Sequence, residues 1–138
     1  MELIEWILQD SNIAKAIKQG TRNKGAAGID NMTVDEVKDY IAEHGEEVKN
    51  QIRNKQYKPT PVKRVYIPKA NGKKRPLGIP IVIDRVIQQA VAQILTLGYE
   101  KYFSDHSMGF RPQRGCHQAI EQVLTYLNEG YEWVIDME

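Results

Sequence analysis

The chain has little of several features that mark large classes of protein. It holds one cysteine, Cys116, in 138 residues, so it forms no internal disulfide and fits a reducing compartment. No apolar run approaches the roughly 18 residues that span a bilayer. Acids stand in residues 1–6, where a secretory signal would carry lysines. Repeats and low-complexity tracts are also missing. These absences favour a cytoplasmic globular protein that does not enter a membrane.

Acidic residues are missing from one long stretch of the chain. Residues 49–82 contain ten lysines and arginines and no aspartate or glutamate, although the whole chain has a net charge of only +1. The rest of the chain therefore sums to −9 against +10 here. Charge segregated in this way predicts a surface for a polyanion on one part of the fold. The alternative is a solvated face that serves solubility alone.

A basic hairpin is predicted over residues 61–80, inside the acid-free stretch. Asn71-Gly72 stands between two extended runs and is a strong turn signal, because both residue types accept positive φ. Prolines in the returning run remove hydrogen-bond donors, so we expect a two-stranded finger or an edge strand. The tip carries four cations and no acid, a set suited to phosphates: Lys69, Lys73, Lys74 and Arg75.

The rest of the chain is mostly helical by the spacing of its apolar residues. Helices are predicted over 1–9, 12–19, 34–54, 84–99 and 116–128. Thr33 and Glu36 form a capping-box pattern before the third of these helices, and Asp84 is placed to cap the fourth. Cys116 falls on the apolar face of the last helix, so we expect its thiol in the core rather than in a reactive site.

Two irregular segments are suited to nucleic acid. Residues 23–33 contain Gly25 and Gly28 among other small residues, which let a backbone lie close to a ligand and present amides to an anion. A plain connection between helices is the alternative for this segment. Residues 107–116 combine Phe110 with two arginines, and such loops hold single-stranded or irregular nucleic acid.

Motifs for hydrolysis are absent: there is no nucleophile elbow, no Cys/His metal cluster and no phosphate-binding P-loop. Tyr131–Ile135 is predicted as a strand that delivers Asp136 at its carboxyl end. Two-metal phosphoryl transfer needs at least two carboxylates to hold its ions. Asp136 is the one member of such a pair that the sequence offers.

Four segments, in order, resemble the successive conserved blocks of a group II intron-encoded reverse transcriptase (maturase). They read NKGAAGIDNMT from Asn23, RVYIPKANGKKRPLGIPIVIDRVIQQA from Arg64, FSDHSMGFRPQRGCHQAI from Phe103 and WVIDME from Trp133. The order and spacing of the four blocks make the resemblance specific. It implies an α+β fold: a mostly helical fingers subdomain over 1–130 with a lid loop at 23–31 and the basic hairpin, then the first palm strand over 131–138.

The resemblance also implies roles for individual residues. Lys69 and Arg75 would grip the triphosphate of the incoming nucleotide, with Phe110 and Arg111 in the same pocket. Asp136 would be the first metal-binding, catalytic aspartate. The implied nucleic-acid contacts are Asn23, Lys24, Gly25, Ala26, Gly28, Ile29, Lys63, Arg64, Lys73, Lys74, Ile79, Pro80, Arg85 and Arg114.

By the same resemblance, the complete enzyme is an RNA-directed DNA polymerase that uses Mg²⁺ and serves splicing and retrotransposition of its intron. Its partners would be an RNA template, a DNA or RNA primer, dNTPs and the group II intron RNA. The family's Tyr/Phe-x-Asp-Asp box is not in these residues, nor are a thumb and a maturase domain. We therefore expect this stretch alone neither to polymerise nor to hold Mg²⁺.

Two other functions stay open at this point. The chain could be a non-catalytic RNA-binding module, or a structural domain whose basic face has no ligand. The unfinished strand at 131–135 would present an open edge, and such edges invite pairing. A homodimer through that edge, or through helix faces normally covered by the palm, is a further hypothesis.

Overall fold

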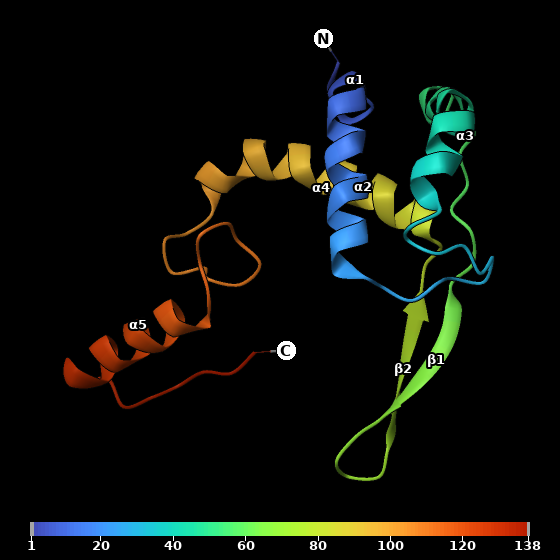
Figure 1. Cartoon of the computed structure of the whole chain (residues 1–138). Coiled ribbons are helices and arrows are strands. Elements are labelled where there is room, and N and C mark those ends of the chain that lie inside the picture. The colour runs from blue at the N-terminus through green and yellow to red at the C-terminus, as the bar shows by residue number, and fades with distance from the viewer. Residues whose placement is uncertain (1, 138) are drawn as a thin grey trace. The chain divides into compact units, whose positions relative to one another are not determined.

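The computed structural model describes residues 2–137. Their elements, in chain order, are α1 (Leu3–Ile7), α2 (Asp10–Asn23), α3 (Val37–Arg53), β1 (Lys63–Pro68), β2 (Lys74–Ile79), α4 (Val82–Tyr99), the short 3₁₀ helix η1 (Glu100–Tyr102) and α5 (Cys116–Asn128) (Figure 1). The α+β prediction is confirmed at this level. No described helix is long and apolar enough to cross a membrane.

The chain divides into two compact units, Met1–Leu97 and Gly98–Glu138. The first contains α1 to α3, the hairpin and nearly all of α4. The second contains η1, a long loop and α5. The predicted division into fingers and palm near residue 130 was based on function, and it does not coincide with the boundary between these two compact units. It stays a prediction.

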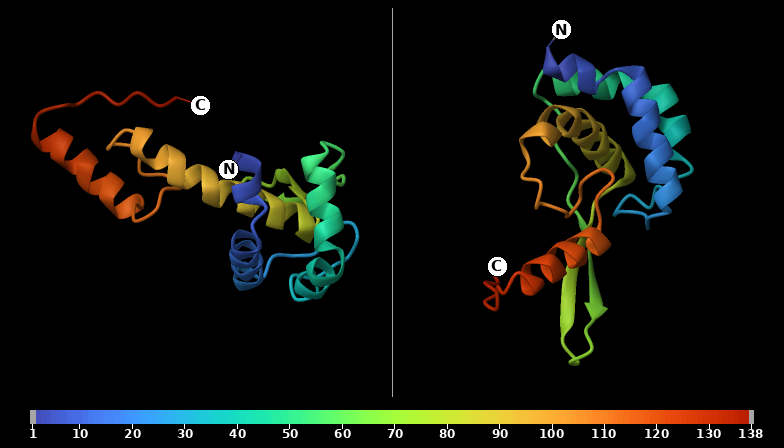
Figure 2. Two further views of the ribbon diagram at one scale, coloured as in Figure 1. Left: turned by 90° about the horizontal axis from the view of Figure 1, so that it is seen from above. Right: turned by 90° about the vertical axis from the view of Figure 1, so that its left-hand side faces the viewer.

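The core of the first unit lies where the N-terminal helices meet α4 (Figure 2). Its buried apolar side chains are Ile7, Leu8, Ile13, Ala16, Val34, Val37, Ile81, Val82, Ile83, Val86 and Ala90. Asn12 is buried among them and donates to the backbone oxygens of Ile7 (2.9 Å) and Ala90 (3.0 Å). A buried amide must find such partners, because an unsatisfied polar group in the core destabilises the fold. Asn12 therefore fixes the α1–α2 junction against α4.

The helix boundaries differ from the predictions by a few residues. The predicted helix over 12–19 runs instead as α2 over Asp10–Asn23, so Gly20 lies inside it and Lys24 ends it with a left-handed φ of 48°. A single glycine costs a helix only about 1 kcal/mol, which the packing of α2 offsets. The helix predicted from 34 begins at Val37. Ahead of it the Glu36 carboxylate accepts the Thr33 backbone N–H (2.8 Å), one half of the expected capping box.

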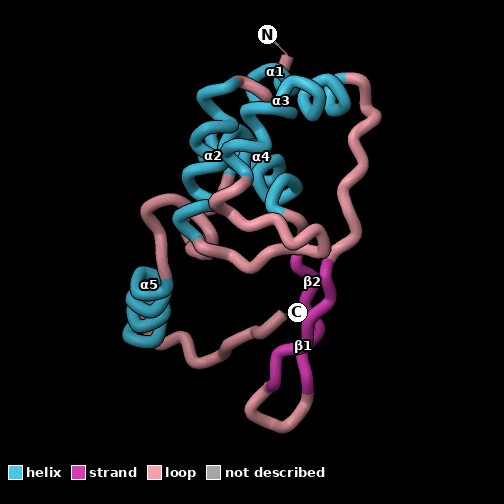
Figure 3. Tube along the Cα trace, turned by 45° about the vertical axis from the view of Figure 1, so that its right-hand side comes forward, coloured by secondary structure: helices cyan, strands magenta, loops and turns pink. Residues whose placement is uncertain are grey.

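The hairpin forms as predicted, with β1 and β2 antiparallel, and it extends away from the helices of its unit (Figure 3). The register runs from Lys63 opposite Ile79 to Pro68 opposite Lys74. The turn around Asn71-Gly72 spans residues 69–73, and the Lys69 amide donates to the Lys73 carbonyl (2.7 Å). Only Gly72 in this turn has positive φ, at 76°.

In the second unit the expectation of a buried α5 is wrong. Cys116 is exposed, and α5 contains no buried residue. The apolar face is present as the spacing predicts, but the described residues do not cover it; its exposed members are Ile120, Val123, Leu124 and Leu127. The strand predicted over Tyr131–Ile135 is not formed among the described residues either, because a strand needs a neighbour for its backbone hydrogen bonds. Its assignment as a palm strand stays a prediction.

Candidate nucleic-acid and nucleotide interface

The cations of the acid-free stretch fall into two groups. Lys49 and Arg53 on α3 form ion pairs: Lys49 Nζ lies 2.5 Å from Asp10 Oδ1 and 2.6 Å from Glu46 Oε1, and Arg53 Nε lies 2.9 Å from Glu5 Oε1. The Lys49 ammonium holds the pKa of the Asp10 carboxyl below its ordinary value. These two cations therefore join α3 to α1 and α2.

The other eight cations of the stretch form no ion pair with any residue that the structure describes. They are Lys55, Lys58, Lys63, Arg64, Lys69, Lys73, Lys74 and Arg75. All of them are exposed. The surface open to a polyanion is thus narrower than the charge pattern suggested, and it is centred on the hairpin.

The register of the hairpin decides which of these cations share a face. Residues directly opposite each other project to one side of a two-stranded sheet, and so do residues two apart along a strand. Lys63 stands opposite Ile79, and Ile67 stands opposite Arg75. One face therefore combines two cations with a half-buried apolar stripe that includes Ile79. Three residues predicted from the sequence, Lys63, Arg75 and Ile79, lie together there.

The predicted lid loop lies directly on the start of α4. Arg85 Nη2 donates to the Ala26 carbonyl (2.6 Å), and a Cβ at Gly25 would stand 2.4 Å from Arg85 Nη1. A Cβ at Gly28 would stand 2.7 Å from the Cα of Ile81. Both glycines therefore permit close approach, as the sequence indicates, but the contact is with the protein's own α4 segment. In this structure Arg85 anchors the loop, and its contact with nucleic acid stays a prediction.

A hollow of about 330 Å³ lies beside the lid loop, between α2 and α4. Its polar lining includes Asn23, Arg85, Gln88 and Gln89. Arg85 Nε is buried there without a hydrogen-bond partner among the described residues. The fold thus brings three of the predicted contacts, Asn23, Gly25 and Arg85, to one concave surface.

Gly28→Ala is expected to destabilise the first unit and displace the lid loop, because the new methyl group would collide with the Ile81 backbone, which cannot swing aside. Overpacking of this kind costs about 1–3 kcal/mol. The control is Gly20→Ala in α2, where the new Cβ would have no atom within 4 Å apart from its chain neighbours and the nearby backbone of the helix itself. It should stabilise by about 1 kcal/mol. Urea unfolding measures both. Equal stabilities for the two variants would contradict the close contact.

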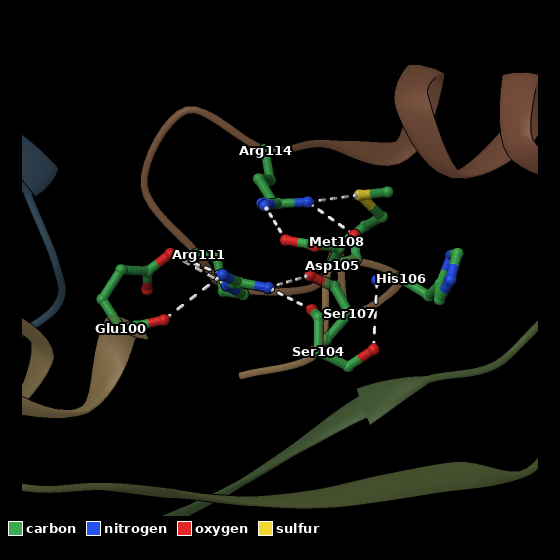
Figure 4. A network of polar contacts seen from close by, with 8 residues as sticks. All are labelled: Glu100, Ser104, Asp105, His106, Ser107, Met108, Arg111 and Arg114. Atoms are coloured by element: carbon green, nitrogen blue, oxygen red, sulfur yellow. Dashed lines mark hydrogen bonds and ion pairs between the residues drawn. The ribbon is translucent and has the colours of Figure 1, made fainter. Parts of the chain in front are cut away.

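In the second unit, Arg111 holds its own loop together (Figure 4). Its guanidinium donates to Glu100 Oε1 (2.9 Å) and to the carbonyls of Ser104 (2.6 Å) and Ser107 (2.8 Å), and its side chain is only 7% exposed. Arg114 likewise donates to the Asp105 carbonyl (2.6 Å). The planar fork of donors in arginine suits it to an irregular loop whose carbonyls lack partners.

Phe110, the neighbour of Arg111, is fully exposed and has a positive φ of 56°. The loop therefore presents the aromatic ring outward while its two arginines face inward. Arg111 and Arg114 were expected to contact nucleotide and nucleic acid directly. Their hydrogen bonds show that they support the loop in this structure. The ligand contacts of Arg111, Arg114 and Phe110 all remain predictions.

Asp136 is exposed and has no hydrogen-bond or ion-pair partner among the described residues. A free carboxylate is the hard oxygen donor that Mg²⁺ prefers, so Asp136 fits as one ligand. Within residues 2–137, however, no group of three or more His, Cys, Asp or Glu side chains is placed to hold a metal ion. Asp136 could supply one ligand of such an ion, and its role in a magnesium site stays a prediction.

Sequence reasoning missed the part played by Asp84 in placing the hairpin. Asp84 is 4% exposed and accepts hydrogen bonds from the Tyr57 hydroxyl (2.5 Å) and the Thr60 amide (2.9 Å). Tyr57 and Thr60 lie on the chain that enters β1, whereas Asp84 lies in the first turn of the helix that follows β2. Both ends of the hairpin are thus tied together. No sequence signal could have found these partners, because they lie 27 and 24 residues from Asp84 along the chain.

Burial and the Asp84 carboxylate also change the pKa of Tyr57. Burial raises the pKa of Tyr57 well above its ordinary value of 10.0, and the hydrogen bond to Asp84 raises it further. Tyr57 therefore keeps its proton at alkaline pH values where an ordinary tyrosine would lose it. We call the set of Tyr57, Thr60 and Asp84 the hairpin clamp.

Comparison with known proteins decides the family. Residues 67–138 match the family described as reverse transcriptase (RNA-dependent DNA polymerase). The chain belongs to this family. It is 42% identical over 137 residues to the group II intron-encoded protein LtrA of Lactococcus lactis subsp. cremoris, and 36% identical over 140 residues to protein YkfC of Escherichia coli (strain K12). Both alignments cover 97% of the chain.

The chain is also 31% identical, over 122 residues and 88% of its length, to the putative COX1/OXI3 intron 2 protein of Saccharomyces cerevisiae. It spans 22% of LtrA, 37% of YkfC and 13% of the yeast protein. The group II intron resemblance is therefore confirmed. The chain corresponds to a minor part of the length of these relatives.

Proposed function

We propose that the chain supplies the fingers of a group II intron RNA-directed DNA polymerase, binding template and intron RNA and placing the incoming nucleotide. The observation that carries the proposal is the set of eight exposed cations on and beside the hairpin, none of which has an ion-pair partner among the described residues. A carboxylate partner would cancel the charge of a cation, whereas these eight cations keep their full charge and can bind phosphates. The family supplies the chemistry that such a surface would serve.

The nucleotide is held by the tip and one face of the hairpin. Lys69 places a compact charge at the turn, and Arg75 presents a planar fork that can bind two phosphate oxygens at once. Such charge-assisted bonds stabilise the negative charge that develops on the transferring phosphoryl group. Ile79 and Pro80 would pack against the templating base pair, and Phe110 would add an apolar wall.

Template RNA would be contacted by the lid loop and by the remaining cations of the hairpin. Asn23 and the backbone of residues 24–29 face the template phosphates in this proposal, with Arg85 as the anchor that keeps the loop on α4. Lys63, Arg64, Lys73 and Lys74 would hold phosphates of the template or of the intron RNA. Phosphate contacts of this kind give affinity and position without sequence preference.

Asp136 would provide one carboxylate ligand for Mg²⁺ in the complete polymerase, with further ligands from residues outside this chain. When bound, the metal pair aligns the attacking and leaving oxygens of the nucleotidyl transfer. Asp136 itself offers an unpaired carboxylate for that purpose. By this proposal, the chain alone binds RNA but does not polymerise.

The RNA-binding part of the proposal is tested by measuring the affinity of this chain for RNA across salt concentration. Each neutralised phosphate contributes about 0.7 to the log–log slope for a single strand, so Lys63→Gln with Lys73→Gln should lower the slope by about 1.4. The control pair, Lys15→Gln with Lys18→Gln, removes the same charge from exposed positions of α2 and should leave the slope unchanged. A flat salt dependence of the unmodified chain would refute the phosphate contacts.

A second function, an RNA-binding module without catalysis, rests on the same eight exposed and unpaired cations among the described residues and needs no metal ligand. Both functions predict RNA binding by this chain. They differ in whether Asp136 matters to primer extension when the chain is part of the whole polymerase.

A further inference from the structure

The hairpin has a second face, opposite to the one that carries Lys63, Arg75 and Ile79. The register places Arg64 opposite Gly78, Tyr66 opposite Pro76, and Pro68 opposite Lys74. These residues alternate with those of the first face, so they project to the other side of the sheet. Every one of them is exposed, whereas the first face includes the half-buried Val65, Leu77 and Ile79. The second face is therefore open along its whole length.

Tyr66 lies at the centre of this face, 60% exposed. Arg64 is two residues before it on β1, and Lys74 pairs with Pro68, two residues after it. Given the rise of about 3.3 Å per residue in a strand, each cation stands roughly 7 Å along the sheet from the tyrosine. The ring is thus flanked on both sides by a positive charge. No acid lies on either strand.

Tyr66 differs from every other tyrosine of the chain. The chain has seven tyrosines, and six of them contact another side chain: Tyr57 donates to Asp84, Tyr40 stacks on His44, and the rings of Tyr99, Tyr102, Tyr126 and Tyr131 pack against one another in pairs. Among the described residues, the hydroxyl of Tyr66 has no hydrogen-bond partner and its ring has no aromatic or cationic contact. Within the described residues, the Tyr66 side chain therefore makes none of the polar or ring contacts that hold the other six tyrosines.

The surface opposite Arg64 is apolar. Gly78 has no side chain, and Val62 Cγ2 lies 2.6 Å from the position that a Cβ of Gly78 would take, so the Val62 side chain lies over this glycine. Pro76, opposite Tyr66, adds a flat apolar ring without a hydrogen-bond donor. The result is a shallow surface with an apolar centre and charged ends, on which a planar group can lie.

We propose that this second face binds single-stranded nucleic acid, with one base stacked on Tyr66 and the flanking phosphates held by Arg64 and Lys74. An exposed aromatic ring between cations on a sheet surface is the arrangement that unpaired strands recognise, since every base has a flat face and every nucleotide a phosphate. A duplex hides its base faces and would gain only the phosphate contacts. The proposal extends the proposed function, because it assigns a separate strand-binding surface to the back of the nucleotide-binding hairpin.

The test measures binding of the 138-residue chain to a fluorescent ten-nucleotide single-stranded RNA, the same sequence as single-stranded DNA, and an RNA duplex of equal length. Loss of one stacked base corresponds to a roughly 5- to 150-fold rise in Kd. Tyr66→Ala should show this rise for both single strands and change duplex binding less than about twofold. Tyr66→Phe keeps the ring and should bind as the unmodified chain does.

Tyr102→Ala is the matched control, since Tyr102 is more exposed than Tyr66 but lies on η1 beside Lys101 instead of between two cations on a strand. It should leave all three affinities unchanged. Unchanged single-strand binding by Tyr66→Ala, an equal loss for the duplex, or a loss for RNA but not DNA would each overturn the stacking site. Circular dichroism confirms that the variant is folded.

The salt experiment separates this proposal from the proposed function on which it rests. A steep salt dependence with no effect of Tyr66→Ala would remove the stacking site alone. A flat salt dependence would remove the phosphate contacts of the hairpin, and with them both proposals. A steep dependence together with a selective single-strand loss supports both.

Discussion

Asp136→Asn is expected to abolish primer extension by the complete polymerase while this chain binds RNA as before. The amide keeps the size of the carboxylate but loses its negative charge, and Mg²⁺ depends on charged oxygen ligands. Changes to residues that merely orient a metal ligand cost about 10- to 100-fold, so loss of a ligand should exceed that range. The rate of primer extension at saturating dNTP and template measures the effect.

Glu132→Gln is the control for this experiment. It removes one negative charge from the same exposed segment, four residues before Asp136, and likewise has no side-chain partner among the described residues. We expect extension within about twofold of the unmodified enzyme, because an exposed surface charge contributes little. If Asp136→Asn extended primers as well as Glu132→Gln does, Asp136 would not be a metal ligand, and the chain would be better described as an RNA-binding module.

The hairpin was predictable because its determinants are local. Alternation along residues 61–68 and the turn at Asn71-Gly72 are both contained in a short stretch, and together they set the antiparallel pairing. Once the register is known, the face shared by Lys63, Arg75 and Ile79 follows. The length of the turn did not follow, because the hydrogen bond from Lys69 to Lys73 depends on the conformation of every residue between them.

Features that depend on distant partners could not be predicted in the same way. The spacing of apolar residues predicted an apolar face on α5 but could not show whether another element covers it. Cys116 is exposed because no described residue covers that face. Arg111 next to Phe110 indicated a ligand-binding loop, but the sequence could not indicate the hydrogen bonds that the guanidinium donates to Glu100 and two loop carbonyls. The sequence shows that an arginine lies on a loop, but it does not show which carbonyl and carboxylate oxygens of that loop are free to accept its hydrogen bonds.

Asp84 is another residue whose distant partners could not be predicted from the sequence. The sequence places it to cap a helix, but α4 begins two residues earlier, at Val82, and the carboxylate serves Tyr57 and Thr60 instead. Partners separated by more than 20 residues leave no periodic signal in a single sequence. The hairpin can therefore be recognised from its own residues, whereas its attachment to the helices is visible only in the fold.

Asp84→Ala is expected to lower the free energy of unfolding of the first unit by about 2–4 kcal/mol, because the Tyr57 hydroxyl and the Thr60 amide both lose a charged acceptor. This is a large share of the roughly 5–15 kcal/mol that stabilises an ordinary domain. Urea unfolding measures the total loss of free energy of unfolding. Hydrogen exchange shows which segment is destabilised: amides of residues 57–79 should exchange faster than those of α2.

Tyr57→Phe separates the two bonds of the hairpin clamp. It keeps the ring and the Thr60–Asp84 bond, so it should cost about 1 kcal/mol and leave exchange in the hairpin nearly unchanged. If Asp84→Ala matched Tyr57→Phe in both measurements, the carboxylate would not hold the entry to β1.

The pH dependence gives the clamp a signature that simple packing would not have. The folded protein raises the pKa of Tyr57 above its ordinary value of 10.0, so the unfolded chain releases this proton first as pH rises. The stability due to the protonated tyrosine is therefore complete below pH 10 and is lost as the pH climbs toward the raised value. Tyr57→Phe should remove that part of the alkaline decline, because phenylalanine has no proton to release. An equal decline in both proteins above pH 10 would mean that the buried hydroxyl is not tied to the folding equilibrium.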